Sequence, residues 1–272
     1  LSTKAGKEAY VEPEIERRGY RFRVKVGKPK NAETAKNGTK LSRGANFQCL
    51  MSGMPIEADY IRSEAQAGRM RTRLMAIVAE GEHGRVYLAP ALEHEAVPRT
   101  AKPSWKPDLR VPTPCHDVDR LPMYGMPTWG DAFTPRQLVA LTTFSDMVHE
   151  AHERVKHDAV AAGLVDDAMP LAAAGTGAIA YADAVGVYLA FLVNQVANHS
   201  SSMCGWNSAN TQMRSVFARQ AIPMVWDYAE SNPFCDSSGS FNNLYERQVK
   251  GFEALGYGKP GIAKQADVNS QT

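Results

Sequence analysis

A run of prolines near the middle of the chain restricts the possible fold more than any other feature. Seven of the 33 residues from 98 to 130 are proline. Proline has no backbone N–H and its ring fixes φ, so such a stretch cannot sustain a helix or a central strand. We therefore predict an extended connector over residues 98–130, between a first part at residues 1–97 and a second at residues 131–272.

The first part is predicted to be a small lobe rich in strands. Residues Tyr20 to Val26 alternate apolar and basic side chains, and this period of two is typical of a half-buried strand. Pro55 to Gly68 fits a short helix that ends at its glycine. Leu74 to Val78 and Val86 to Leu88 are β-rich runs separated by two glycines, and we predict that they pair as a hairpin.

Charge is unevenly distributed along the chain, although the formal net charge is only +2. Residues 1–73 contain 16 basic and 8 acidic residues, whereas the remaining 199 contain 15 basic and 21 acidic ones. Such a surplus on one lobe favours contact with a polyanion. A solvated basic face without a partner explains the same surplus equally well.

The second part is predicted to be mainly helical. Thr134 to Gln137 supplies an N-cap, a first-turn proline and a capping box, and predicts a helix that continues to about Ala162. Further helices are expected at Asn210 to Glu230, with a break at Pro223, and at Ser240 to Leu255. The whole chain is thus expected to have an α+β fold: a small basic strand-rich lobe, a proline-rich connector and a mainly α-helical bundle.

One stretch is long and apolar enough to be compared with a membrane span. Ala178 to Ala197 comprises twenty residues with Asp183 as its one charge. Asn194, Gln195 and the whole-chain mean hydropathy of −0.35 argue against insertion. Because a helix that is apolar all round is more often the central helix of a bundle, we predict a buried helix here.

The cysteines bear on both cellular location and metal binding. Cys49, Cys115, Cys204 and Cys235 are widely spaced, and none forms a C-x-x-C pair. Scattered thiols are typical of a reducing compartment, so we predict a cytoplasmic location. Cys49 stands where a zinc knuckle would begin, but Ser52 occupies the second ligand position. A tetrahedral zinc site needs four ligands, so no metal is expected.

Three other motifs have both a functional and a structural interpretation. His149, Glu153 and His157 share a helix face and could contact one ion, but such a face is more often simply solvated. Gly175 to Gly177 lacks the lysine of a phosphate loop and is predicted to be a helix-entry turn. Asn232 to Phe234 lacks the second proline of the Asn/Asp-Pro-Pro-aromatic motif of DNA methyltransferases, so we predict a helix-terminating turn.

Several stretches of the second part together carry a family resemblance. They are Tyr124 to Thr143, containing YGM, FTPRQL and ALTT; Ala180 to Ala190; and Cys204 to Phe234, containing CGWN, FARQAIPMVWD and NPF. Together they resemble the large adenine-specific DNA methylases that carry a zinc-ribbon-like segment. The likeness covers about residues 40–260 and is strongest from 124 to 240.

The resemblance implies a role as one segment of a longer enzyme. In that family an S-adenosylmethionine motif lies upstream of this region and an Asp-Pro-Pro-Tyr catalytic motif lies downstream, and neither occurs here. The start at Leu1 and the end at Thr272 also have the character of internal positions. We expect the segment to lie between the two motifs, where related enzymes place target recognition. It would bind no S-adenosylmethionine itself, and no catalytic residue is assigned to it.

The expected function is therefore that of a DNA-contacting and scaffold segment of an S-adenosylmethionine-dependent N6-adenine DNA methyltransferase. Its partners would be double-stranded DNA and the remainder of the methyltransferase chain. Phosphate contact needs only lysine or arginine on an exposed face. The candidate residues are Arg21, Arg23, Lys25, Arg69, Arg71 and Arg73. The alternative is a non-enzymatic helical interaction module of a DNA modification or phage-defence system.

Overall fold

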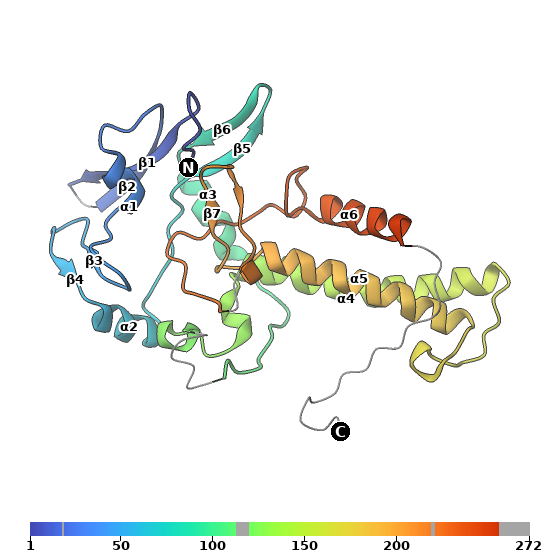
Figure 1. Cartoon of the computed structure of the whole chain (residues 1–272). Coiled ribbons are helices and arrows are strands. Elements are labelled where there is room, and N and C mark those ends of the chain that lie inside the picture. Colours follow the sequence, from blue (N-terminus) through green and yellow to red (C-terminus); the bar gives the residue numbers. More distant parts are fainter. Residues whose placement is uncertain (18, 113–119, 219–220, 256–272) are drawn as a thin grey trace, which may run out of the picture.

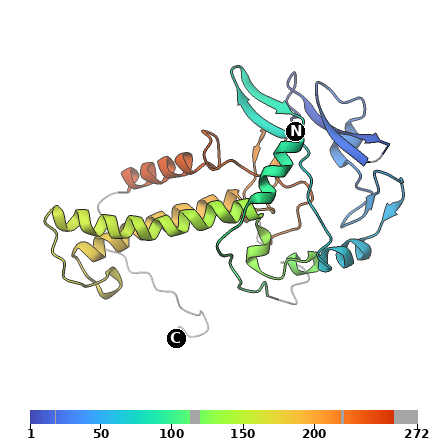
Figure 2. The same cartoon turned by 180° about the vertical axis from the view of Figure 1, so that it is seen from behind.

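The computed structural model describes residues 1–17, 19–112, 120–218 and 221–255. It confirms the predicted mixed α+β architecture. Figure 1 and Figure 2 show short strand pairs gathered at one end of the molecule, with a long helical hairpin projecting from the other. The domain boundaries at residues 97 and 130 stay a prediction.

Within the described ranges the strands form four separate antiparallel pairs. These are β1 (Ala9–Glu16) with β2 (Gly19–Val26), β3 (Phe47–Gln48) with β4 (Pro55–Ile56), β5 (Ile77–Gly81) with β6 (Gly84–Leu88), and β7 (Trp206–Asn207) with β8 (Gln212–Met213). The predicted strand over Tyr20–Val26 is confirmed. The predicted hairpin is confirmed as β5–β6, but its first strand begins at Ile77 and not at Leu74, and its second begins at Gly84 and not at Val86. The strand that pairs with β2, β1, was not predicted.

Three short helices complete the first part of the chain. They are α1 (Ala32–Asn37), α2 (Ala58–Gln66) and α3 (Leu92–Ala96), and a 3-10 turn at Val97–Thr100 follows the last of them. The predicted helix that ends at Gly68 is confirmed as α2, but it begins at Ala58 and not at Pro55, because Pro55 and Ile56 form strand β4. Gly68 has a φ of 70°, a left-handed conformation that glycine adopts without steric cost and that ends the helix.

The second part contains the long helices α4 (Pro135–Ala161), α5 (Ala178–His199) and α6 (Phe241–Ala254), with a 3-10 turn at Leu171–Ala173 before α5. The predicted capping box of α4 is confirmed. The Gln137 N–H donates to Thr134 Oγ1 at 3.3 Å, and the Thr134 N–H donates to Gln137 Oε1 at 2.8 Å. Helices α4 and α5 lie side by side as an antiparallel hairpin, and α6 packs on α5 (Figure 1).

The predicted helix from Asn210 to Glu230 is wrong. Residues 206–213 form the β7–β8 hairpin, a 3-10 turn follows at Val216–Ala218, and residues 221–230 are irregular; residues 219–220 lie outside the described ranges. A side chain starts the turn between the two strands. Asn207 Oδ1 accepts hydrogen bonds from the N–H groups of Ala209 and Asn210, at 3.2 and 3.3 Å. An asparagine side chain commonly accepts hydrogen bonds from nearby backbone N–H groups in this way and so favours a turn.

The prediction of an all-round buried helix at α5 is also wrong. Only 22% of the most apolar 18-residue stretch of α5 is buried. The buried residues of the helix are Ala178, Ala180, Ala182, Leu192 and Val196. By length and composition alone, α5 is the one helix within the described ranges that could cross a membrane. Its neighbours α4 and α6 cover part of its circumference, which leaves one apolar side uncovered.

The proline-rich segment supplies much of the main hydrophobic core. Apart from short 3-10 turns at Val97–Thr100, Leu121–Tyr124 and Trp129–Ala132, its described residues are extended or irregular, as expected; residues 113–119 are not described. Instead of only linking the two parts, it buries Val111, Leu121 and Met126 against α2 and the chain after α5. Tyr124 also belongs to this core. Its ring lies edge-on to Trp226, with 5.2 Å between the centroids. Proline removes hydrogen-bond donors without preventing apolar packing, so an irregular segment can still form a core.

This packing predicts a marked loss of stability in Leu121→Ala. Leu121 is fully buried, so truncation should lower the free energy of unfolding by about 2–5 kcal/mol in a urea titration. Leu109→Ala is the matched control within the same segment, because Leu109 is 71% exposed and its loss should change stability by less than about 0.5 kcal/mol. Equal stability of the two variants would show that the segment is only a linker.

Candidate nucleic-acid interface

The β1–β2 hairpin places the predicted DNA-binding residues Arg21, Arg23 and Lys25 on one exposed face, as expected. The opposite strand carries acidic side chains on the same face. Arg21 Nε lies 2.6 Å from Glu14 Oε2 and 2.9 Å from a Glu16 oxygen, and Arg23 Nε lies 2.9 Å from Glu14 Oε2. Lys25 Nζ lies 3.8 Å from a Glu12 oxygen. The three cations therefore form a ladder of cross-strand ion pairs with three carboxylates.

The ion pairs at the centre of this ladder favour the ionised forms of Glu14 and Arg21. Hydrogen bonds from Arg21 and Arg23 lower the pKa of Glu14 from its ordinary 4.5 to about 2, and Glu14 in turn raises the pKa of Arg21. A shallow hollow of about 340 Å³ lies over the ladder and is lined by Glu12 and Glu14 as well as by Arg23 and Lys25. Because both signs of charge line it, this face is a poor match for a polyanion.

The second predicted group, Arg69, Arg71 and Arg73, lies on the extended chain after α2 and is also engaged. Both nitrogens of the Arg69 fork donate to the Glu64 carboxylate at 2.7 Å, and Arg71 Nη1 donates to the carbonyls of Gly68 and Met70. Arg73 Nε donates to Glu95 at 2.9 and 3.1 Å.

The structure does not gather the six predicted residues on one surface. The Arg73 guanidinium lies 5.1 Å from the ring centroid of Tyr20. Tyr20 and Arg21 are consecutive strand residues, so their side chains point to opposite faces of the hairpin. Arg73 therefore lies on the other side of the hairpin from the ladder.

A different cationic surface is formed by the N-terminal residues. Ser2 and Ala9 exchange backbone hydrogen bonds of 2.9 and 3.0 Å, which close residues 2–9 into a loop. Within it the Lys7 N–H donates to the Lys4 carbonyl at 2.9 Å, and Gly6 supplies the positive φ of 74° at the third position of this turn. One tight turn thus holds Lys4 and Lys7 close together.

The loop is fixed against the β7–β8 hairpin, which comes from the opposite end of the sequence. The Thr3 N–H donates to the Ser208 carbonyl at 3.0 Å, and Trp206 Nε1–H donates to the Leu1 carbonyl at 2.6 Å. The β5–β6 hairpin also contacts the β7–β8 hairpin: the Arg85 guanidinium lies 5.8 Å from the Trp206 ring centroid. Three segments that are distant in sequence therefore converge.

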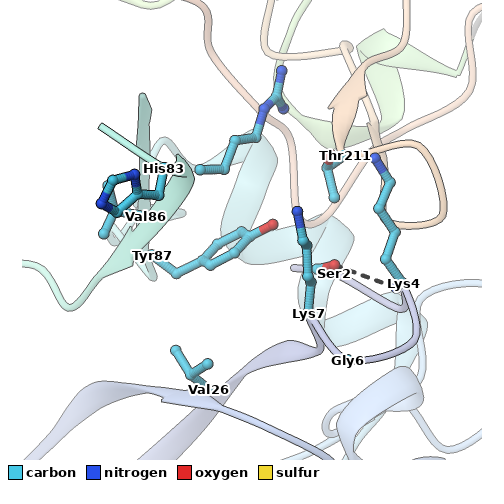
Figure 3. Close-up of a pocket in the computed structure, with 10 residues that line it drawn as sticks. Ser2, Lys4, Gly6, Lys7, Val26, His83, Val86, Tyr87 and Thr211 are labelled. Atoms are coloured by element: carbon cyan, nitrogen blue, oxygen red, sulfur yellow. Dashed lines mark hydrogen bonds between the residues drawn. The ribbon is translucent and has the colours of Figure 1, made fainter. Parts of the chain in front are cut away.

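Between these segments lies a hollow of about 460 Å³, which we call the basic hollow (Figure 3). Residues of the N-terminal loop, the end of β2, the β5–β6 hairpin and the turn before β8 line it. They are Ser2, Lys4, Gly6, Lys7, Val26, His83, Arg85, Val86, Tyr87 and Thr211. These described lining residues include three cations and a histidine but no carboxylate. Among the described residues, no side-chain ion pair engages Lys4 or Lys7, whereas Arg85 pairs with Glu80 at 3.4 Å.

Sequence reasoning missed the basic hollow because its residues are far apart in the chain. A local signal did exist, since residues 1–7 contain Lys4 and Lys7 on either side of Gly6 and no acidic residue. The ladder had a signal too: Glu12, Glu14 and Glu16 alternate in the strand before Tyr20.

The motifs weighed for metal binding lie in the β3–β4 turn and on helix α4. Cys49 begins the turn between β3 and β4, where its N–H donates to the Met54 carbonyl at 2.8 Å. Within the described residues no group of three or more His, Cys, Asp or Glu side chains could hold a metal ion, and this includes His149, Glu153 and His157.

Gly175 to Gly177 forms the predicted helix-entry turn before α5. A Cβ on Gly175 would collide with the backbone of Met169, and one on Gly177 with that of Val165. These glycines are therefore explained by close packing of the preceding loop. The turn follows a 3-10 turn and not a strand, so it does not fit an S-adenosylmethionine loop.

Asn232 to Phe234 forms a turn, although no helix precedes it. Asn232 Oδ1 accepts from the Phe234 N–H at 3.0 Å, so its side-chain carbonyl oxygen already has a local donor. Phe234 is 75% exposed. The expectation of a turn is confirmed, and the expectation that the turn ends a helix is wrong.

Comparison of the chain with protein-family models, with curated proteins and with solved structures finds no match. The assignment of a function therefore depends on the geometry and charge described above.

The ion-pair ladder predicts an unusual titration of Glu14. Its side-chain carboxyl should titrate in NMR with a pKa of about 2, and Arg21→Ala/Arg23→Ala should raise that pKa toward the ordinary 4.5. Since the folded-state pKa is depressed, the stabilisation by this carboxylate is complete above the unfolded pKa and is lost as the pH falls toward about 2.

Lys25→Ala is the matched control for this titration, because the Lys25 ammonium contacts Glu12 and not Glu14. It should leave the pKa of Glu14 unchanged. An ordinary pKa for Glu14 in the parent chain would mean that the ladder does not form in solution.

Proposed function

We propose that this chain is a DNA-contacting and scaffold segment of an N6-adenine DNA methyltransferase, and that the basic hollow provides its main phosphate contact. The observation that carries the proposal is the position of Lys4 and Lys7 in a hollow that no carboxylate lines. The family resemblance of the second part agrees with this role. S-adenosylmethionine would be bound by the remainder of the parent protein.

Because the cations of the ladder are paired with carboxylates, we expect the DNA phosphate to contact the basic hollow and not the ladder. A phosphate approaching Arg21, Arg23 or Lys25 would have to compete with Glu12, Glu14 and Glu16. Within the part of the chain that the structure describes, no carboxylate pairs with Lys4 or Lys7, so a phosphate approaching them would have no such ion pair to displace. Release of counterions from the phosphate drives this kind of binding and makes it salt-dependent.

A cytoplasmic location belongs to the same proposal. The described cysteines Cys49, Cys204 and Cys235 are free thiols, as expected in a reducing compartment. Cys115 lies outside the described residues.

Salt-dependent DNA binding tests the proposal. We expect the 272-residue chain to bind a fluorescein-labelled duplex at low salt, with an affinity that falls as KCl is raised. Lys4→Ala/Lys7→Ala should weaken binding and reduce the slope of log affinity against log salt by about 0.9, the change expected when the one phosphate contact that the two lysines share is lost. Fluorescence anisotropy across a KCl series measures both quantities.

Two control variants make the result specific. Arg247→Ala/Lys250→Ala removes the same charge from α6, away from the hollow, and should leave the slope unchanged (Figure 1). Arg21→Ala/Arg23→Ala/Lys25→Ala should reduce the slope by less than the Lys4/Lys7 variant does. If the triple variant lowers the slope more, the ladder is the phosphate site. If the parent chain binds no DNA at low salt, the proposal fails.

A second candidate function, a helical interaction module, is favoured by the uncovered side of α5. Tyr181, Val187 and Phe191 are between 46% and 56% exposed, whereas the Tyr188 ring packs on Phe252 of α6 with 4.3 Å between the ring centroids. A contiguous apolar surface of this kind commonly marks a protein-binding face. The partner would be another protein of a DNA modification or phage-defence system, and the role would not require contact with DNA.

The exposed side of α5 predicts weak self-association of the isolated chain. Sedimentation velocity at high protein concentration should detect larger species that disappear in Tyr181→Glu/Phe191→Glu, because each substitution puts a charge on the apolar side. Met147→Glu is the control, since Met147 is a 54% exposed residue of α4. A strictly monomeric parent chain would count against this second function.

A further inference from the structure

We propose that the basic hollow receives an unpaired nucleotide of a single DNA strand, with its phosphate on Lys4 and Lys7 and its base against Tyr87. This inference rests on the proposed function and adds to it the form of DNA that the hollow accepts. It predicts that the site distinguishes a single strand from a duplex.

The hollow has one cationic side and one apolar side. Lys4 and Lys7 extend from the N-terminal turn, and the ring of Tyr87 extends into the hollow with its hydroxyl foremost (Figure 3). Val26 and Val86 also line it and are 75% and 42% exposed. Apolar surface beside two ammonium groups without an ion pair suits a ligand that is itself part anionic and part apolar. A nucleotide has this composition.

The volume of the basic hollow suits a single nucleotide and not a duplex. The hollow of about 460 Å³ falls in the range of small-molecule sites, so it can enclose one nucleotide and not a double helix. In a duplex both faces of every base are stacked on neighbouring bases. A duplex can therefore present only its phosphates to Lys4 and Lys7, whereas an unpaired strand can also place a base on the ring of Tyr87.

The neighbouring contacts keep the hollow in place without closing it. Arg85 is engaged by Glu80 and by the Trp206 ring, so its guanidinium serves as a wall and leaves Lys4 and Lys7 as the phosphate contacts. Tyr87 lies in β6 opposite Val78, which fixes its backbone in a strand pair. The backbone of Tyr87 is thus ordered in advance of binding, so a base that stacks on the ring has only side-chain freedom to restrict.

The experiment compares a fluorescein-labelled oligo-dT strand with a duplex, using the full chain and fluorescence anisotropy. Tyr87→Val removes the ring and keeps a residue of high β-propensity. It should weaken strand binding by about 5- to 100-fold, the effect of losing one stacked base, and change duplex binding by less than about twofold. Tyr87→Phe, which keeps the ring, should bind the strand as the parent chain does.

The outcomes distinguish this inference from the proposed function. If Tyr87→Val changes neither affinity while Lys4→Ala/Lys7→Ala lowers both, the hollow contacts phosphates alone, so the inference is overturned and the proposed function stands. If Tyr87→Val lowers both affinities equally, Tyr87 supports the fold of the hollow and not a base, and the inference is again overturned. If neither form of DNA binds to the parent chain at low salt, both proposals fail.

Discussion

The burial of Leu121, Tyr124 and Met126 joins the two ends of this molecule. These side chains come from the proline-rich segment and pack against α2 on one side and against the chain after α5 on the other. The four strand pairs contain two strands each, and a lone two-stranded hairpin is at best marginally stable in water. The β3 strand contributes Phe47 to this core, and β2 and β6 contact each other. A segment with few regular hydrogen bonds is the centre of the fold because its apolar side chains, and not its backbone, make the decisive contacts.

Ion pairs within the fold reduce the positive charge that the basic residues of the first part offer to an anionic partner. Glu14 lies within hydrogen-bond distance of both Arg21 and Arg23, so much of the positive charge of β2 is compensated at short range. Exposed pairs of this kind add little to stability, but they reduce the field that a phosphate would experience. Charge that no neighbour compensates has more influence on an anionic partner. On this ground Lys4 and Lys7 are stronger candidates than the residues of the ladder.

Local features of the fold could be predicted from the sequence, and long-range ones could not. The alternation of Tyr20 to Val26 and the Thr134 capping box are each determined by a few neighbouring residues, and both predictions are confirmed. The predicted helix at Asn210 to Glu230 failed because apolar spacing did not reveal the β7–β8 pairing or the packing of Ile222, Met224 and Trp226 on the main core. The burial of α5 was overestimated because composition does not tell how many neighbours a helix has. The basic hollow requires Lys4, Tyr87 and Thr211 to meet, and no local pattern indicates that meeting.

Hydrogen bonds attach the N-terminal loop of the basic hollow to chain that leaves the hydrophobic core. Met203 is buried in the main core, and three residues further along the chain the Trp206 indole donates to the Leu1 carbonyl. Thr3 bonds Ser208 in the same hairpin, so the chain before the turn that carries Lys4 and Lys7 is held by chain that leaves the core. After the turn, the Gly27 N–H donates to the Glu8 carbonyl, and Ala9 exchanges backbone hydrogen bonds with Ser2. A loop of seven or eight free residues would lose much of its conformational entropy on binding an anion. Because folding has already ordered this loop, the two lysines can be held together before any ligand arrives, which is the condition under which two cations act on one phosphate.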